Sequence, residues 1–201
     1  MKITSYTGGV TETNGWLIET PDGNLVVDAP EGIAGWLAQQ GVRVDDVLLT
    51  HQHYDHVLDA AALRQAGARL HAFAAYSTEL TLESLARGWG MPVAVAPYQI
   101  DALLDVSQPL RLAGLEFELA HIPGHAADAV TFYLAAEGVL FSGDTLFAGS
   151  IGRTDLPGGS TQMLLDGIAR HLLVLPPSTR VLSGHGPATT IAREAAGNPF
   201  L

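Results

Sequence analysis

The sequence feature that most constrains this chain is a histidine-rich segment that directly follows a short apolar run. Residues 47–56 read VLLTHQHYDH, so His51, His53, Asp55 and His56 fall within six positions. Imidazole and carboxylate groups are the usual protein ligands of zinc and of other first-row metals. A solvated polar turn would explain one histidine here. Three histidines and an aspartate after a buried-looking strand instead predict a metal site.

Composition limits the classes of protein to consider. The chain has 201 residues, which fits a single domain with a core of two or more layers. Its net charge of −11 disfavours nucleic-acid binding through a basic face, and the absence of cysteine excludes disulfides and thiolate ligands. Neither a signal-peptide core at the N-terminus nor an apolar run of transmembrane length is present. We expect a cytoplasmic protein with a small-molecule substrate and no membrane partner; the oligomeric state is left open.

The apolar pattern predicts strands that alternate with helices in the first half and a strand-rich second half. Predicted strands cover residues 2–6, 15–20, 25–28, 45–50, 68–73, 110–112, 115–122, 129–134, 139–142 and 180–183. Predicted helices cover residues 31–40, 56–66, 77–87, 161–173 and 190–196. No linker or low-complexity tract marks a second domain, so we expect one domain over residues 1–201.

Three connections leave alternatives open. Residues 7–14 are rich in glycine and threonine and fit a hairpin loop slightly better than a flap over a substrate. Asp28 ends a predicted strand, where it could support a ligand histidine or cap a turn. In the irregular segment 88–98, core filling is the default role for Trp89 and Met91, and a substrate entrance is the alternative.

Three later positions repeat the pattern of an apolar strand, a small residue and then a candidate ligand. They are His125, Asp144 and His185. Each would lie at the carboxyl end of a strand, where α/β sheets commonly place their sites, and the adjacent glycines would let the backbone approach closely. The remaining histidines carry weaker signals. His121 is expected in a strand or beside the site, and His71 and His171 are expected to be structural or exposed.

The motifs together resemble those of the metallo-β-lactamase superfamily. Residues 51–56 match its H-x-H-x-D-H signature, and Pro-Gly-His at 123–125, Gly-Asp at 143–144 and Gly-His-Gly-Pro at 184–187 match its later ligand motifs in order. The resemblance implies an α/β fold, the four-layer αββα sandwich, with the metal site at one edge of the two sheets. It implies one metal bound by His51, His53 and His125, a second by Asp55, His56 and His185, and Asp144 as the bridge.

Within the superfamily, the chain looks most like the short bacterial glyoxalase II-like proteins. The similarity lies in Asp-Thr-Leu-Phe at 144–147, Gly-Arg-Thr-Asp at 152–155, Pro-Gly-Gly at 157–159 and the closing Asn-Pro-Phe-Leu. Two departures stand out. Ala126 replaces a threonine often found after Pro-Gly-His, and the chain ends soon after His185, so we expect no separate glutathione-binding carboxyl-terminal domain.

The resemblance implies a metal-dependent hydrolase that cleaves hydroxyacylglutathione-type thioesters with a hydroxide generated at two divalent cations. Zinc is the expected ion, and iron or manganese would accept the same ligands. Asp55 is the candidate for ligation combined with proton handling. Arg153 could bind a substrate carboxylate, although an internal salt bridge to Asp155 is the favoured alternative.

Other functions share the same residues. A persulfide dioxygenase would use a single iron held by His51, His125 and Asp144, and a lactonase would use the same hydroxide on an ester. A true β-lactamase is disfavoured because a bridging aspartate such as Asp144 is typical of other branches. A non-catalytic metal-stabilised binding protein is the competing class, but structural zinc sites are usually closed, four-coordinate and often rich in cysteine.

Overall fold

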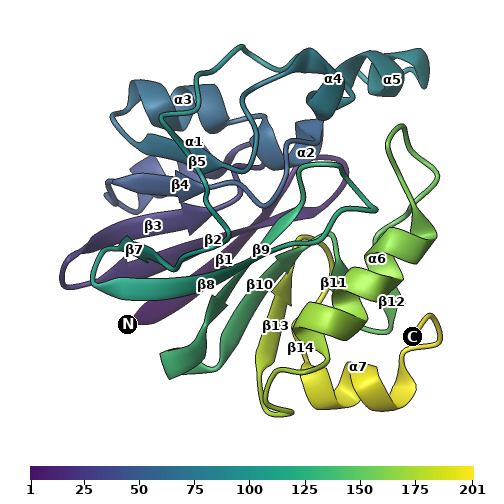
Figure 1. The fold of residues 1–201 in the computed structure, drawn as a ribbon. Coiled ribbons are helices and arrows are strands. Elements are labelled where there is room, and N and C mark those ends of the chain that lie inside the picture. The colour runs from purple at the N-terminus through teal and green to yellow at the C-terminus, as the bar shows by residue number, and fades with distance from the viewer.

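The computed structural model, which describes residues 1–201, consists of two six-stranded sheets packed face to face with helices on both outer surfaces (Figure 1). The strand orders are β1-β2-β3-β4-β5-β6 and β14-β13-β10-β9-β8-β7, and a two-stranded hairpin, β11-β12, forms a third, separate sheet. The expected αββα sandwich is confirmed. No helix has the length and apolar character needed to cross a membrane.

The first sheet begins as an antiparallel meander and continues with parallel strands. Its strands are β1 (Lys2–Gly8), β2 (Thr13–Thr20), β3 (Gly23–Val27), β4 (Asp46–Leu48), β5 (Arg69–Ala72) and β6 (Ala102–Leu103). The helices that connect or follow them are α1 (Ile33–Gln39), α2 (Tyr54–Val57), α3 (Ala60–Gln65), α4 (Thr78–Thr81) and α5 (Glu83–Gly88). Strand β4 is buried along its whole length, as expected for a parallel strand covered on both faces.

The second sheet is antiparallel except where β10 pairs with β13. Its strands are β7 (Leu110–Leu112), β8 (Leu115–His121), β9 (Val130–Leu134), β10 (Val139–Gly143), β13 (Arg180–Ser183) and β14 (Thr189–Thr190). A 3-10 turn at Ala135–Glu137 joins β9 to β10, and the hairpin consists of β11 (Leu146–Phe147) and β12 (Ser150–Ile151). Helices α6 (Thr161–Gly167) and α7 (Ile191–Gly197) lie along its outer side (Figure 1).

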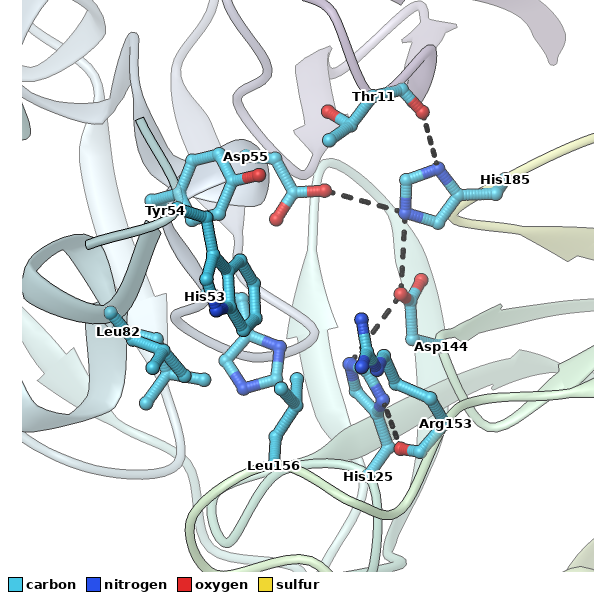
Figure 2. Close-up of a pocket in the computed structure, with 12 residues that line it drawn as sticks. Thr11, His53, Tyr54, Asp55, Leu82, His125, Asp144, Arg153, Leu156 and His185 are labelled. Atoms are coloured by element: carbon cyan, nitrogen blue, oxygen red, sulfur yellow. Dashed lines mark hydrogen bonds and ion pairs between the residues drawn. The ribbon is translucent and has the colours of Figure 1, made fainter. Parts of the chain in front are cut away.

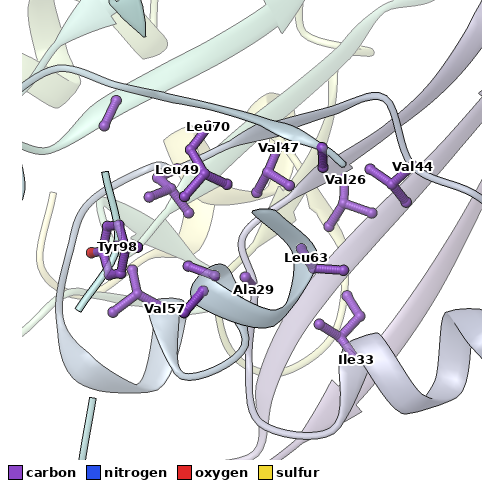
Figure 3. Close-up of a cluster of buried hydrophobic side chains, with 14 of the residues drawn as sticks. Val26, Ala29, Ile33, Val44, Val47, Leu49, Val57, Leu63, Leu70 and Tyr98 are labelled. Atoms are coloured by element: carbon purple, nitrogen blue, oxygen red, sulfur yellow. The ribbon is translucent and has the colours of Figure 1, made fainter. Parts of the chain in front are cut away.

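The core has three apolar layers because side chains alternate between the two faces of each strand. On β2, Leu17 packs toward the helices α1–α3 while its neighbour Ile18 packs between the sheets. Figure 3 shows the outer layer, where Val26 and Val47 from strands face Leu63 of α3. The middle layer includes three fully buried phenylalanines, Phe117, Phe132 and Phe141. Truncating one such residue to alanine typically costs about 3–5 kcal/mol.

Three of the predicted helices differ from the observed ones. The helix expected at 56–66 begins earlier, at Tyr54, and is interrupted before Ala60, where the Asp59 carboxylate accepts a hydrogen bond from the backbone of α1. The helix expected at 77–87 is divided at Leu82, whose φ of 52° is left-handed. The helix expected at 161–173 is α-helical only to Gly167 and continues as a π-helical turn over Ile168–Leu172. Four two-residue strands, β6, β11, β12 and β14, were not predicted.

Candidate metal centre

The first four candidate ligands lie in the loop after β4 and in α2. His51 and His53 belong to the loop, and Asp55 and His56 lie in the single turn of α2. The loop is fixed at its start because Asp28, at the end of β3, accepts hydrogen bonds from the backbone nitrogen and the hydroxyl of Thr50 at 2.8 Å each. The two parallel strands thus hold the ligand loop at their shared carboxyl edge.

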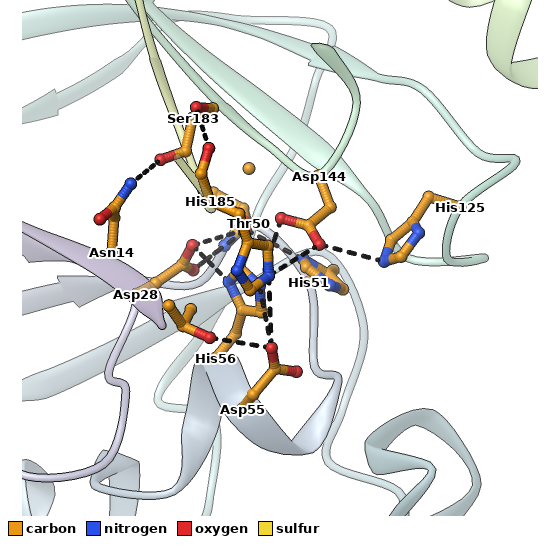
Figure 4. A network of polar contacts seen from close by, with 12 residues as sticks. Asn14, Asp28, Thr50, His51, Asp55, His56, His125, Asp144, Ser183 and His185 are labelled. Atoms are coloured by element: carbon orange, nitrogen blue, oxygen red, sulfur yellow. Dashed lines mark hydrogen bonds and ion pairs between the residues drawn. The ribbon is translucent and has the colours of Figure 1, made fainter. Parts of the chain in front are cut away.

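The other three candidate ligands come from the second sheet at the same edge of the sandwich. His125 follows β8, Asp144 follows β10 directly, and His185 follows β13 (Figure 4). Gly184 lies so close to the centre that a Cβ there would be 2.6 Å from Cε1 of His56 and would also collide with a carboxylate oxygen of Asp144. A glycine is therefore required for this approach of the β13 end.

The structure brings together all seven residues that the sequence singled out as metal ligands. Their ligand atoms form three groups, each with all atoms within 4.8 Å of one another. The groups are His51, His53 and His125; His51, His56 and Asp144; and Asp55, His56 and His185. Asp144 Oδ2 also lies 3.5 Å from His125 Nε2 and 3.3 Å from His185 Nε2, so its carboxylate stands between the outer two groups.

Hydrogen bonds to the Nδ1 atoms orient the rings of His51 and His56. His56 Nδ1 lies 2.8 Å from Asp28 Oδ2, and His51 Nδ1 lies 3.1 Å from the Thr50 hydroxyl. Because that hydroxyl donates its hydrogen to Asp28, His51 must donate from Nδ1. In His51 Nε2 is left with a free lone pair that points into the centre, and Nε2 of His56 points into the centre as well.

Backbone carbonyls orient two further rings in the same way. His125 Nδ1 donates to the carbonyl of Arg153 at 2.8 Å, and His185 Nδ1 donates to the carbonyl of Thr11 at 3.0 Å. Such contacts to the distal ring nitrogen are characteristic of histidines that bind metals. The Thr11 contact crosses from the β1–β2 connection to the second sheet, so this connection is part of the site.

Four buried polar atoms that converge on the centre have no hydrogen-bond partner: Nε2 of His51, His56 and His125, and Oδ1 of Asp144. Buried polar atoms are rarely left without a partner, because each loses its hydration without compensation. Three imidazole nitrogens and one carboxylate oxygen are suitable ligands for a divalent first-row cation. The residues present therefore fit a metal centre.

Burial and repulsion keep two of the rings neutral. Burial lowers the pKa of His51 well below its ordinary value, and the adjacent rings of His56 and His53 lower it further. Burial and then the ring of His125 lower the pKa of His53 to about 3. Both rings therefore offer lone pairs at neutral pH.

On the other side of the centre, carboxylates raise the pKa values of two histidines. Burial opposes charge on His56, but Asp144 and Asp28 outweigh it and raise its pKa well above the ordinary value. Burial also opposes charge on His185, yet its contacts with Asp144 and Asp55 raise its pKa to about 10. Burial would raise the pKa of Asp55, but His56 and His185 lower it to about 2, and they likewise keep the pKa of Asp144 well below its usual value.

Two contacts near the centre were not predicted from the sequence. The hydroxyl of Thr13 donates to Asp55 Oδ2 at 2.9 Å, and the amide of Asn14 donates to the carbonyls of Ser183 and Gly186, on either side of His185. The glycine- and threonine-rich composition of residues 7–14 was the only local signal. That connection joins the two sheets at the site. Of the two roles considered for Asp28, support of a candidate ligand histidine is the one observed.

A cavity of about 210 Å³ opens onto the centre (Figure 2). Besides candidate ligands, its lining consists of Thr11, Tyr54, Leu82, Leu85, Trp89, Arg153 and Leu156. Trp89 is 54% exposed, so its default assignment to the core is wrong. Arg153 forms the internal salt bridge favoured by the sequence, with Nε and one terminal nitrogen each 2.7 Å from a carboxylate oxygen of Asp155.

The remaining histidines lie outside the centre, as expected. His71 is buried and its Nε2 lies 2.7 Å from Asp46 Oδ1, a structural role. His121 ends β8, where its ring stacks on Phe73, and His171 is exposed.

Comparison with known proteins decides the family. The family model described as the Metallo-beta-lactamase superfamily matches residues 8–185. The chain belongs to this superfamily. It is 33% identical to the "Probable metallo-hydrolase YqgX" of Bacillus subtilis, over 96% of this chain and 94% of that protein. It is 36% identical to the "Hydroxyacylglutathione hydrolase GloC" of Haemophilus influenzae, over 92% and 91% of the two chains.

Two solved structures agree with this membership of the metallo-beta-lactamase superfamily. BLEG-1, a B3 metallo-beta-lactamase, is 34% identical with a TM-score of 0.88, and the match covers 100% of this chain and 99% of BLEG-1. TTHA1623, solved in a di-iron-bound form, is 37% identical with a TM-score of 0.84, over 98% and 100% of the two chains. Both relatives named by activity are hydrolases, which supports a hydrolytic enzyme with a histidine-rich site that could hold metal ions.

Proposed function

We propose that this protein hydrolyses thioesters of the hydroxyacylglutathione type at a binuclear metal centre. The observation that carries the proposal is the convergence of four buried ligand atoms without hydrogen-bond partners, beside a cavity that reaches them. The 36% identity to a protein named hydroxyacylglutathione hydrolase supports this substrate class. We also propose that residues 1–201 act as one catalytic domain.

The seven residues would divide between two cations. His51, His53 and His125 would hold one, Asp55, His56 and His185 the other, and Asp144 would bridge them. A pair of divalent cations in such a site supplies a water nucleophile at neutral pH and polarises the carbonyl under attack. Zinc is the expected metal on the chemistry of the ligands, and the di-iron form of TTHA1623 supports iron as the alternative.

Asp55 is the residue best placed to handle the proton of the attacking water. It lines the cavity, its Oδ2 lies 3.4 Å from His185 Nε2, and its pKa of about 2 keeps it ionised. When the C–S bond breaks, the sulfur leaves as a thiolate, which is stable enough to need little help from an acid. Because the cations would supply a water nucleophile, the site needs no serine or cysteine nucleophile.

A β-lactam amide is a second candidate substrate. The likeness to BLEG-1, a B3 metallo-beta-lactamase, supports this candidate. Hydrolysis of a chromogenic cephalosporin should therefore be measured on the same sample as thioester hydrolysis.

The test is S-lactoylglutathione hydrolysis by protein whose metal content has been measured, before and after removal of metal by a chelator. We expect hydrolysis that is lost with the metal and restored by adding it back. Asp144→Asn should abolish it, and the exposed Asp166→Asn should not. One iron per chain with oxygen consumption on glutathione persulfide would overturn the proposal in favour of a persulfide dioxygenase. A metal-loaded protein that is inactive on thioesters, lactones and β-lactams would indicate a binding protein.

A further inference from the structure

Four of the residues that line the cavity are large and apolar, and we refer to them together as the apolar wall: Leu82, Leu85, Trp89 and Leu156. Leu82 and Leu156 lie across the cavity from His185 (Figure 2). The three leucines are only half-buried, and the Trp89 side chain is 54% exposed. The free energy of binding becomes more favourable when a ligand covers exposed apolar surface beside a catalytic centre.

The backbone that presents this wall is strained. Leu82 has a φ of 52°, in the left-handed region that residues other than glycine, asparagine and aspartate rarely adopt. This conformation ends α4 and begins α5. Leu82, at the boundary, and Leu85, in α5, both line the cavity. Strain of this kind persists where the surrounding structure enforces it, and it is concentrated at functional sites.

The cavity lining offers no free positive side chain for an anionic group. Arg153 is its one Lys or Arg residue, and two of its nitrogens are bound to Asp155. Its guanidinium carbon also lies 5.7 Å from the ring centroid of Trp89, so the side chain backs the wall. Recognition next to the metal centre therefore depends on apolar contact more than on charge.

We propose that the apolar wall selects substrates that carry an uncharged apolar group next to the scissile bond. This inference rests on the proposed thioester hydrolysis and specifies its substrate class. Thioesters with an alkyl or aryl group next to that bond would be better substrates than the small, hydroxylated lactoyl thioester. The apolar group can belong to the acyl half or to the thiol half, because both halves adjoin the bond that breaks.

Binding of thioethers tests the wall without relying on turnover, because a thioether cannot be hydrolysed. S-methyl-, S-butyl- and S-hexylglutathione carry the same charges and differ only in apolar length. For the metal-loaded protein, calorimetry should show the dissociation constant falling about fourfold for each added methylene that the wall covers. Trp89→Ala and Leu85→Ala should remove most of this dependence, and Trp89→Phe should retain part of it. Val174→Ala, a substitution at a side chain 71% exposed outside the cavity lining, should leave it unchanged.

Measurements of kcat/KM then show whether the apolar group belongs to the acyl half or to the thiol half of the substrate. The S-lactoyl, S-butanoyl and S-hexanoyl thioesters of glutathione vary the acyl half. The acetyl thioesters of glutathione and of benzyl thiol vary the thiol half. A rise in kcat/KM with apolar size in either series, reduced by Trp89→Ala, is the expected result. Equal affinity for the methyl and hexyl thioethers, or an equal effect of Trp89→Ala on all of them, would overturn the inference. Length-dependent binding without hydrolysis of any thioester would overturn the proposed function alone.

Discussion

His56 Nδ1 lies 2.8 Å from Asp28 Oδ2, and both side chains are buried. The same carboxylate binds Thr50, so one residue at the end of β3 sets both the ring orientation of a candidate ligand and the course of the ligand loop. Asp28 itself has a left-handed backbone, with a φ of 62°. Few residues other than glycine, asparagine and aspartate adopt that conformation readily.

Asp28→Asn should therefore weaken metal binding without unfolding the chain. Asparagine tolerates the left-handed backbone and can still accept hydrogen bonds, but it removes the charge that supports His56. Loss of such a contact typically costs 10- to 100-fold in metal affinity. Competition with a coloured chelator measures the change, with Asp166→Asn as the control. Equal affinities in the two variants would contradict the role given to Asp28.

Gly184→Ala should disrupt the centre more than its small size suggests. The added methyl group would collide with Asp144 and His56, so the end of β13 must move and carry His185 with it. We expect loss of metal binding and of hydrolysis. Gly35→Ala is the matched control, because nothing lies within 4 Å of a Cβ at that position in α1, where alanine should stabilise the helix by about 0.5–1 kcal/mol. A Gly184→Ala protein that retains its metal would refute the close approach.

Metal binding should release protons. Contacts with Asp144 and Asp55 raise the pKa of His185 to about 10, so without a bound cation this ring carries a proton throughout the neutral range. A cation must displace that proton, and its apparent affinity should therefore fall as the pH is lowered. Calorimetry in buffers of different ionisation enthalpy counts the protons released. His185→Ala, which removes a ligand of the second site, should release fewer protons per chain than wild type, and an unchanged count would contradict the assigned contact.

Behind the ligand loop lies a buried polar chain that the sequence did not indicate. Gln52, between His51 and His53, donates to Asp128 Oδ2 at 3.2 Å, and its own oxygen accepts from the Tyr98 hydroxyl at 3.0 Å. Burial raises the pKa of Asp128 to about 6. This chain joins the loop that carries His51 to the segment that follows His125.

Asp128→Asn should change the pH dependence of stability. The folded-state pKa of Asp128 lies above its ordinary value of 3.8, so the carboxyl favours the folded state while protonated, and this contribution is lost as the pH rises through about 6. Asparagine does not titrate. Relative to wild type, the variant should gain up to about 3 kcal/mol between pH 4 and pH 7.5. Urea unfolding at both pH values measures the difference, and a gap that does not change with pH would contradict it.

The candidate ligands could be located from the sequence because they follow the ends of four apolar strands. A run such as 47–50 before His51, or 139–142 before Asp144, is a local signal, and the carboxyl ends of such strands meet at one edge of the fold. The apolar pattern also predicts the long strands, whereas the packing of two sheets was implied by the resemblance to the superfamily. The expectation that glycines beside the ligands allow a close approach of the backbone also holds at Gly184, where the packing leaves no room for a Cβ.

The features that escaped prediction depend on contacts between distant segments. The helix break at Leu82 opposes the propensity of a sequence that fits a continuous helix, and no local pattern marks Trp89 as exposed. The contact between Thr13 and Asp55 joins residues 42 positions apart, and the two-residue strands are too short to show a period. Periodicity reports on single elements and carries no information on such pairings.

The central claim is that seven residues assemble two metal sites that share Asp144. Elemental analysis of purified wild-type protein, His53→Ala and His185→Ala, each loaded with metal and dialysed against a weak chelator, tests it directly. The seven-ligand arrangement predicts about two ions per chain in wild type and about one in each variant, since each substitution removes a ligand from a different site. One ion per chain in the wild type, or the same ratio in all three proteins, would contradict it.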